Sequence, residues 1–397
     1  MTLEERDVRA EIPARRRVVL KTFVGLMGVA SIGLAVAADQ RWWDHHFLPI
    51  FYLPRSLYTL GEFCVRAVLA VLGAALVLAA RPRPRLGRLA ARVPPLTFAA
   101  TTARVLLAIL LALGSSELIL RGAFRYGVDQ PRPEAEPLCP PDQRLGWIFA
   151  PAHSARIRVD GRDVEYAFDA AGYRVRRPGE QVDPERPTIL FTGESIMAGY
   201  GLSWDESVPA IVGGLLGVQS ANLAVFGYSN GQAYLRIAEE LPHFRKPVAV
   251  VSLFASSLFD RNLRDDRLHF GPGLIWLPAA HRWRLAALVK VVWPYRSDAS
   301  IERGIAITAA VLRANVDLAR ARGAEPLIVV PQVGAESAVE EMLRRRILDE
   351  TGLPYLQVKL DPSWHLLGDL HPDPRAARAI AIAVAGRLQG HLRVSAN

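Results

Sequence analysis

The chain is poor in the residues that build disulfides and metal sites. Its 397 residues include only two cysteines, Cys64 and Cys139, and neither belongs to a Cys-x-x-Cys pair. A His-Glu-x-x-His motif and an acidic calcium loop are also missing, and we interpret His45-His46 as a solvated pair. We therefore expect no intrachain disulfide, no bound metal and no cofactor.

The positive charge of the chain is unevenly distributed. The net charge is +9, and residues 1–136 hold 18 Lys and Arg against 11 Asp and Glu, which leaves the remainder nearly neutral. The remainder has no basic stripe with interleaved aromatic residues, which is the pattern of a nucleic-acid-binding surface. We expect no nucleic-acid partner, and the basic charge needs another explanation.

Long apolar runs are concentrated in the first third of the sequence. The segments 18–38, 57–80 and 97–120 each approach the roughly 20 residues that cross a bilayer as a helix. In the second, Glu62 and Arg66 stand four residues apart and can pair on one helix face. No small-x-small cleavage site after the first segment leads directly into a soluble domain, so we prefer a retained helix to a signal peptide.

We therefore expect a membrane region over residues 1–122 with three transmembrane helices. Arginines precede the first segment and fill the loop between the second and third: Arg9, Arg15, Arg16 and Arg17, then Arg81, Arg83, Arg85, Arg88 and Arg92. The positive-inside rule places both regions in the cytoplasm. Three spans from a cytoplasmic N-terminus put the rest of this multi-pass chain outside the cytoplasm.

The residues after the membrane region fall into three parts. Residues 123–145 form a proline-rich linker, a composition that gives a stiff spacer. Residues 146–185 form a small β-rich lead-in, because two alternating segments flank Asp160-Gly161, a pair suited to a tight hairpin turn. Residues 186–397 form the main domain.

The main domain alternates short apolar runs with helical patterns. We predict strands at 188–192, 219–225, 248–254, 326–331 and 354–359, and helices at 204–216, 230–241, 301–322, 337–349 and 373–388. Such alternation predicts an α/β fold, a three-layer α/β/α domain with a parallel sheet. Ligands in such folds bind at the carboxyl ends of the strands.

A serine stands at one of these strand ends. Ser195 follows the strand at 188–192, and Asp369-Leu370-His371 occurs near the C-terminus. A serine hydroxyl becomes a good nucleophile when a histidine accepts its proton and a carboxylate orients that histidine. The three residue types predict a catalytic triad of Ser195, His371 and Asp369.

The arrangement of these motifs resembles the SGNH (GDSL-type) hydrolase superfamily. The serine lies in Gly193-Glu194-Ser195, without the glycine two residues later that the nucleophile elbow of α/β-hydrolases requires. Residues 222–227, Asn-Leu-Ala-Val-Phe-Gly, look like the second block of the superfamily, and residues 369–371 look like the last. Gly146-Trp147 and residues 171–174 are similar to the lead-in of membrane-tethered members.

The resemblance implies an oxyanion hole built from the backbone N–H groups of Ser195 and Gly227 and from a third donor. Members of the superfamily usually supply an asparagine after the third strand, and the resemblance implies Ser257 at that position. Asn230 and Asn262 are the alternatives for this donor.

The implied activity is serine-dependent hydrolysis of O-acyl esters through an acyl-enzyme, outside the cytoplasm. The membrane region favours an acylated envelope glycan or lipid as substrate, and the bilayer itself is a partner. O-acyl transfer to a surface polysaccharide, with a membrane partner as acyl donor, remains an alternative. A catalytically inactive binding module is the second alternative.

Overall fold

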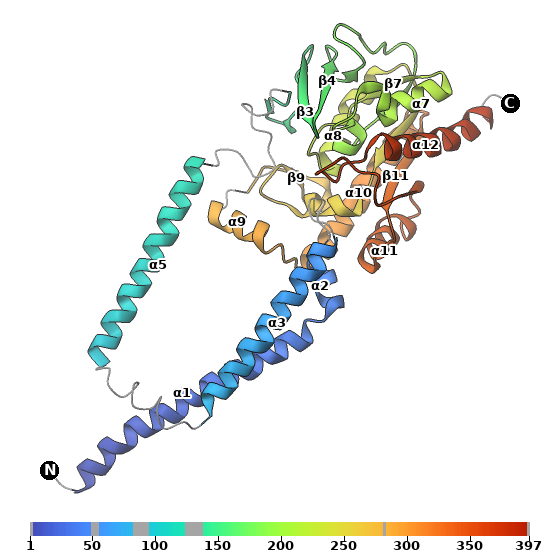
Figure 1. The fold of residues 1–397 in the computed structure, drawn as a ribbon. Helices are drawn as coiled ribbons and strands as arrows, with labels where there is room; N and C mark the ends of the chain where they lie inside the picture. Colours follow the sequence, from blue (N-terminus) through green and yellow to red (C-terminus); the bar gives the residue numbers. More distant parts are fainter. Residues whose placement is uncertain (1–2, 49–54, 82–94, 124–137, 281–282, 395–397) are drawn as a thin grey trace. The chain divides into compact units, whose positions relative to one another are not determined.

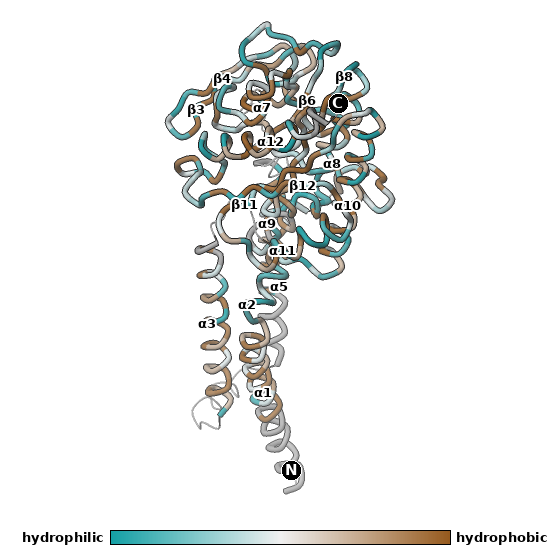
Figure 2. Tube along the Cα trace, turned by 90° about the vertical axis from the view of Figure 1, so that its right-hand side faces the viewer, coloured by the Kyte–Doolittle hydropathy of each residue, from teal (hydrophilic) through white to brown (hydrophobic). Residues whose placement is uncertain are grey.

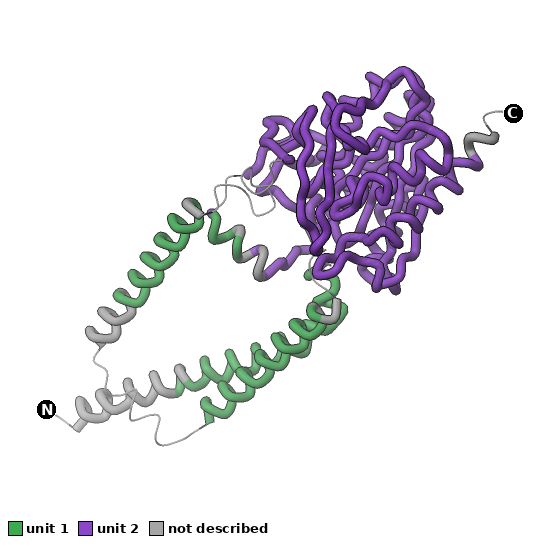
Figure 3. The backbone as a smooth tube through the Cα atoms, turned by 45° about the horizontal axis from the view of Figure 1, so that its top comes forward, with its two compact units in different colours: residues 1–47, 53–123, 284–289 green, residues 48–52, 124–283, 290–397 purple. Residues whose placement is uncertain are grey.

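A computed structural model describes residues 3–48, 55–81, 95–123, 138–280 and 283–394. Contacts divide the chain into two compact units, which Figure 3 shows in two colours. The first comprises residues 1–47, 53–123 and 284–289, and the second comprises the remaining residues. Most of the predicted proline-rich linker, residues 124–137, lies outside the described residues.

The first unit is helical. Its elements are α1 (Leu3–Ala37), α2 (Gln40–His46), α3 (Arg55–Ala80) and α5 (Pro95–Ala123), and it shares α9 (Arg284–Val292) with the second unit (Figure 1). The three apolar segments predicted from the sequence all fall within these long helices, except that α1 ends one residue early. The Glu117 carboxylate of α5 accepts the backbone N–H groups of Arg284 and Leu285, at 2.9 and 2.8 Å, where α9 begins.

Helices α1 and α3 pack closely because glycines meet where they cross. A Cβ atom added at Gly28 would lie 2.7 Å from the Gly73 carbonyl oxygen, and one at Gly73 would lie equally near the Gly28 oxygen. Ser31 Oγ donates to the Leu69 carbonyl at 2.8 Å across the same contact. Small residues and side-chain hydrogen bonds of this kind are typical of helix pairs in membranes.

The charged residues of α3 have partners on neighbouring helices. Glu62, which is buried, accepts a hydrogen bond from the Gln40 side chain of α2. Arg66 Nε donates to the Ala35 carbonyl of α1 at 3.1 Å. The two side chains singled out in the sequence therefore tie α3 to the preceding helices.

The apolar side chains of these helices are largely exposed. Val71 of α3 and Leu118 of α5 are 70% and 73% exposed, and Figure 2 shows hydrophobic colouring along much of α1 and α3. Within the described residues, Thr59–Ala80 is long and apolar enough to cross a membrane, and the bent pair Lys21–Ala37 and Gln40–His46 qualifies as a second span if it is continuous. The described part of α5 adds no further span by this measure.

The second unit is built on an eight-stranded sheet. Its order is β12-β11-β8-β6-β7-β5-β4-β3, and the first five of these strands are parallel. Their bounds are β6 (Pro187–Phe191), β7 (Gln219–Asn222), β8 (Lys246–Leu253), β11 (Glu325–Val333) and β12 (Tyr355–Leu360). All five lie where the sequence predicts strands.

The sheet differs from the prediction because it is mixed. Strands β3 (Ser154–Val159), β4 (Arg162–Phe168) and β5 (Arg174–Val175) are antiparallel and extend the parallel strands, since β5 pairs with β7. The hairpin turn falls at Asp160-Gly161, where both residues have positive φ, 54° and 73°, as a tight primed turn requires. The predicted lead-in is thus continuous with the main sheet.

Helices cover both faces of the sheet, because its buried side chains alternate between two layers. Ile189 and Phe191 pack in a cluster with α7 (Val208–Leu216) and α12 (Pro374–Val394). Leu190 points the other way and packs with Ile237 of α8 (Asn230–Glu240). The α10 helix (Asp298–Ala321) contacts α8. The three-layer arrangement is the one predicted.

Shorter elements complete the second unit. They are β1 (Pro141–Asp142), β2 (Gly146–Trp147), α6 (Ser195–Ala198), β9 (His269–Phe270), β10 (Trp276–Leu277) and α11 (Ala338–Arg344), with 3-10 turns at Trp204–Glu206, Leu241–His243, Ser256–Leu263 and Pro272–Leu274 and a π turn at Arg345–Asp349.

Arg174 of β5 anchors the loop that follows α6. Its side chain is fully buried and donates to the carbonyls of Ala198, Gly199 and Leu202 at 2.6, 2.9 and 2.6 Å, while its guanidinium lies 4.4 Å from the Tyr166 ring centre. Burial lowers the pKa of Arg174 to about 10, which keeps it charged at neutral pH. One side chain of the antiparallel part thus fixes a loop of the parallel part.

Replacing this anchor should destabilise the fold. Arg174→Met keeps the bulk but removes the side-chain donors to the Ala198 and Leu202 carbonyls and one of the donors to the Gly199 carbonyl, so we expect the free energy of unfolding to fall by about 3 kcal/mol. Arg176→Met is the matched control, because Arg176 makes an exposed ion pair with Asp205 and should change stability by less than about 1 kcal/mol. Denaturant titration measures the free energy of unfolding of both variants. If the two variants were equally stable, Arg174 would not be an anchor.

Candidate active site

Ser195 lies at the carboxyl end of β6, at the first position of α6. Gly193 precedes it with φ 153°, and a Cβ atom there would lie 3.3 Å from the Cβ atoms of both Leu253 and Met197. The tight passage from strand to helix therefore requires glycine at this position. It leaves Ser195 buried, with 3% of its surface exposed.

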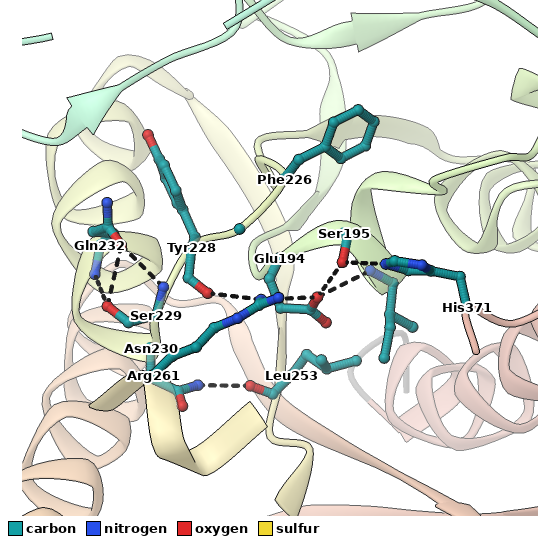
Figure 4. A network of polar contacts seen from close by, with 12 residues as sticks. Glu194, Ser195, Phe226, Tyr228, Ser229, Asn230, Gln232, Leu253, Arg261 and His371 are labelled. Atoms are coloured by element: carbon teal, nitrogen blue, oxygen red, sulfur yellow. Dashed lines mark hydrogen bonds and ion pairs between the residues drawn. The ribbon is translucent and has the colours of Figure 1, made fainter. Parts of the chain in front are cut away.

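The structure brings Ser195 together with the two residues predicted to act with it. His371 Nε2 lies 2.7 Å from Ser195 Oγ, and His371 Nδ1 lies 2.6 Å from Asp369 Oδ1 (Figure 4, which shows Ser195 and His371). The ionised carboxylate can only accept, so Nδ1 carries the proton and Nε2 is left to accept the serine proton. This is the geometry of a general base held next to a nucleophile.

The loop that carries His371 is closed by backbone contacts. His365 and Pro372 form an isolated antiparallel bridge, and the Leu366 N–H donates to the His371 carbonyl at 2.9 Å. The His371 N–H donates to Asp369 Oδ1, also at 2.9 Å, so the same carboxylate oxygen fixes both the backbone and the ring of His371. The single residue between Asp369 and His371 is enough to form this turn.

Asp369 is held in its ionised form. Partial burial opposes ionisation, but hydrogen bonds from the His371 side chain and backbone, together with the charge of His371, outweigh it and lower the pKa of Asp369 below its usual value. The carboxylate that orients the histidine therefore remains charged through the neutral and mildly acidic range.

A second acceptor competes for the proton of Ser195. Glu194 Oε2 lies 2.7 Å from Ser195 Oγ and accepts the Ile196 N–H at 3.2 Å, which also caps α6. Arg261 Nη1 lies 3.6 Å from the same carboxylate oxygen, and both side chains are mostly buried (Figure 4). The hydroxyl has one proton, so it donates to either His371 or Glu194. Arg261 offsets the negative charge next to the nucleophile.

The three predicted oxyanion donors lie in different structural elements. Ser195 is the first residue of α6, and such a position leaves its N–H without an acceptor inside the helix. Gly227, with φ 74°, lies in the loop after β7. Ser257 belongs to the 3-10 turn Ser256–Leu263, and within the described part of the chain its hydroxyl makes no hydrogen bond. Its role as the third donor stays a prediction.

The two alternatives to Ser257 are engaged elsewhere. Asn230 Nδ2 donates to the Leu253 carbonyl at 2.8 Å, which Figure 4 shows, and Asn262 Nδ2 donates to Asn230 Oδ1 at 2.8 Å and to Thr308 Oγ1 at 3.1 Å. These bonds join the end of β8 to α8 and α10. Both amides thus hold the layers of the fold together around the site.

Sequence reasoning missed two side chains that contact the predicted triad or Glu194 next to it. The Tyr200 ring lies 4.4 Å from the His371 ring, and Arg261 pairs with Glu194. A single aromatic or arginine in a loop carries no motif, so the sequence held no signal for either. A small pocket borders Glu194 on the side of β8, and its lining is partly apolar: Gly193, Glu194, Tyr228, Ser229, Asn230, Ala233, Leu253, Ala255 and Leu258.

The lowered pKa of Asp369 predicts a specific pH dependence of stability. A carboxylate with a depressed pKa in the folded state stabilises the fold above its ordinary pKa and loses this contribution as the pH falls through its folded value. The stability difference between the wild type and Asp369→Asn should therefore shrink as the pH is lowered from about 5 to about 3. Denaturant titrations across this range measure it, and a pH-independent difference would contradict the shift.

Comparisons with known proteins find similarity among solved structures alone. No family model matches the chain, and no curated protein matches its sequence. Among solved structures, a lipolytic protein of the G-D-S-L family from Veillonella parvula is 11% identical, with 50% of this chain and 96% of that chain covered and a TM-score of 0.31.

Two further solved structures are those of an esterase and an acyltransferase. An acetyl xylan esterase from Butyrivibrio proteoclasticus is 12% identical over 54% of this chain and 66% of its own, with a TM-score of 0.34. A salicylyl-acyltransferase from a tetracycline biosynthetic pathway is 14% identical over 56% and 59%, with a TM-score of 0.29. Each of these three similarities spans about half of this chain.

Proposed function

We propose that this chain is a serine-dependent O-acyl ester hydrolase of the SGNH type. The observation that carries the proposal is the pair of short contacts from His371, 2.7 Å to Ser195 Oγ and 2.6 Å to Asp369 Oδ1. A buried serine at a strand end, next to a histidine whose other nitrogen meets a carboxylate, has the parts needed to form an acyl-enzyme.

The reaction proceeds in two displacements. Ser195 Oγ attacks the ester carbonyl carbon as His371 Nε2 takes its proton, and the N–H groups of Ser195 and Gly227 donate to the resulting oxyanion. The tetrahedral intermediate collapses, and His371 gives the proton to the departing alcohol oxygen. A water then attacks the acyl-enzyme, loses a proton to His371, and releases the carboxylic acid as Ser195 regains its proton.

O-acyl transfer is the closest alternative, since a sugar hydroxyl can take the place of water in the second displacement. The first displacement and all residue roles are then the same, and a membrane partner can supply the acyl donor. A catalytically inactive binding module is the second alternative. The contact of Glu194 with Ser195 Oγ favours it, because a carboxylate that holds the hydroxyl proton competes with His371.

We also propose that the helices of the first unit span the cell membrane three times, with the N-terminus in the cytoplasm and the active site outside. The exposed apolar side chains of α1, α3 and α5 and the glycine contact between α1 and α3 support this. The substrate is then an acylated envelope glycan or lipid near the membrane surface. Reporter tags should be accessible from opposite sides of the membrane when placed at residues 1 and 397, and a shared side would rule this topology out.

Catalysis should depend on Ser195 in the full-length chain. We expect the detergent-solubilised protein to hydrolyse a chromogenic acetyl ester, and Ser195→Ala to lower the rate by about 10³-fold or more, to the background level. Ser363→Ala is the matched control, because Ser363 is exposed and bonds to Asp361 in a surface turn. Equal rates for the wild type and Ser195→Ala, both folded by circular dichroism, would reject the proposed function.

A further inference from the structure

The direction of the Gly227 N–H depends on one peptide plane. Peptide bonds are planar, and none of those described is cis, so the Phe226 carbonyl and the Gly227 N–H lie on one rigid plane and point in opposite directions. Whatever holds the Phe226 oxygen on one side therefore sets where the Gly227 N–H points on the other. The loop glycine, with φ 74°, does not restrict this plane by itself.

The group that holds the Phe226 oxygen comes from the lead-in segment. Trp147 Nε1 donates to this carbonyl at 2.8 Å, from a side chain that is only 2% exposed. Trp147 forms β2 with Gly146 and lies 79 residues earlier in the chain. An indole has a single donor and a rigid ring, so this buried contact fixes the carbonyl in both distance and direction.

The position of Trp147 is itself fixed by the loop that it supports. Tyr228 Oη donates to the Trp147 carbonyl at 2.7 Å, and the two rings meet edge to face with centres 5.8 Å apart. Arg267 lies 4.9 Å from the centre of the indole ring and donates through Nη2 to the Gly227 carbonyl at 2.8 Å. The peptides on both sides of Gly227 are thus held through residues that contact Trp147.

A further hydrogen bond connects the lead-in to α8, the helix that follows the Gly227 loop. Gln232 of α8 donates through Nε2 to the Leu145 carbonyl at 2.6 Å, and it accepts from Arg267. Gln232 also closes a capping box with Ser229 at the start of α8. The segment before Trp147 therefore cannot shift without disturbing the start of the helix that follows the Gly227 loop.

We infer that Trp147 is a positioning residue for the oxyanion hole, which aims the Gly227 N–H through its hydrogen bond to the Phe226 carbonyl. The inference rests on the proposed function, because it assigns Trp147 a part in acyl-enzyme formation. It also gives the lead-in a role in the reaction, since the segment supplies a structural part of the site. Trp147 does not contact the reacting atoms; it acts through the peptide between Phe226 and Gly227.

The test is the variant Trp147→Phe in the full-length protein. Phenylalanine keeps an aromatic ring in place but removes the indole N–H that donates to the Phe226 oxygen. A misdirected oxyanion donor acts on the transition state, so kcat for the chromogenic acetyl ester should fall by about 10- to 100-fold while KM changes by less than about 3-fold. A role in stability alone would lower the melting temperature and leave kcat of the folded protein unchanged.

Trp276→Phe is the matched control. Trp276 also donates its indole N–H to a backbone carbonyl, that of Arg144 at 2.9 Å, but this carbonyl does not belong to the Gly227 loop. Its loss should leave kcat within about twofold of the wild-type value, since the Arg144 carbonyl is not part of the peptide that carries the Gly227 N–H. Equal kcat values for Trp147→Phe and Trp276→Phe, in the presence of Ser195-dependent turnover, would overturn the inference.

Two further results separate this inference from the proposed function. Absence of Ser195-dependent turnover in the wild type would reject the function and the inference with it, whereas turnover unaffected by Trp147→Phe rejects the inference alone. If Trp147→Phe does not fold, Tyr228→Phe replaces it, because it removes only the hydroxyl that holds the Trp147 carbonyl. A lower kcat at unchanged KM in Tyr228→Phe supports the inference, and an unchanged kcat rejects it.

Discussion

The hydrogen bond between Ser195 Oγ and His371 Nε2 is the contact on which the candidate site depends, and it joins residues 176 positions apart. The two residues are far apart in the sequence, so only the tertiary fold brings them into contact. The parallel strands bring their carboxyl ends to one edge, which places Ser195 after β6, and the loop after β12 returns over that edge with His371. The sheet and its helices therefore hold the segment after β6 and the loop after β12 next to each other.

Much of this frame was predictable because it follows from periodic patterns. Each of the five parallel strands lies in the predicted run, and the motifs at Ser195 and His371 single out three side chains that the structure brings into contact. The antiparallel extension was not predicted, since pairing between β5 and β7 rests on a single register contact, Arg174 with Asn222. The Arg261 contact with Glu194 was missed for a similar reason, because tertiary contacts of single charged residues leave no pattern in a sequence.

Buried charge is the other constraint around the nucleophile. The Glu194 carboxylate lies within hydrogen-bonding distance of the Ser195 hydroxyl and also caps α6. The Arg261 guanidinium forms an ion pair with it. Placing a carboxylate next to a nucleophile costs reactivity unless a cation balances it, and removing either partner leaves the other buried and uncompensated. Arg261 belongs to the 3-10 turn Ser256–Leu263, which also contains Ser257. One short turn thus carries both the balancing cation and the side chain that we predict as the third oxyanion donor.

The antiparallel strands also determine which strand forms this edge of the sheet. Without them β7 would be an outer strand, with its unpaired N–H and C=O groups available to another chain. With β5, β4 and β3 added, the outermost strand on that side is β3, whose Arg156 and Arg158 are exposed and alternate with less exposed residues. Charged side chains on an edge strand oppose pairing with a second copy. The hairpin that opens the domain is therefore also its protection against edge-to-edge aggregation.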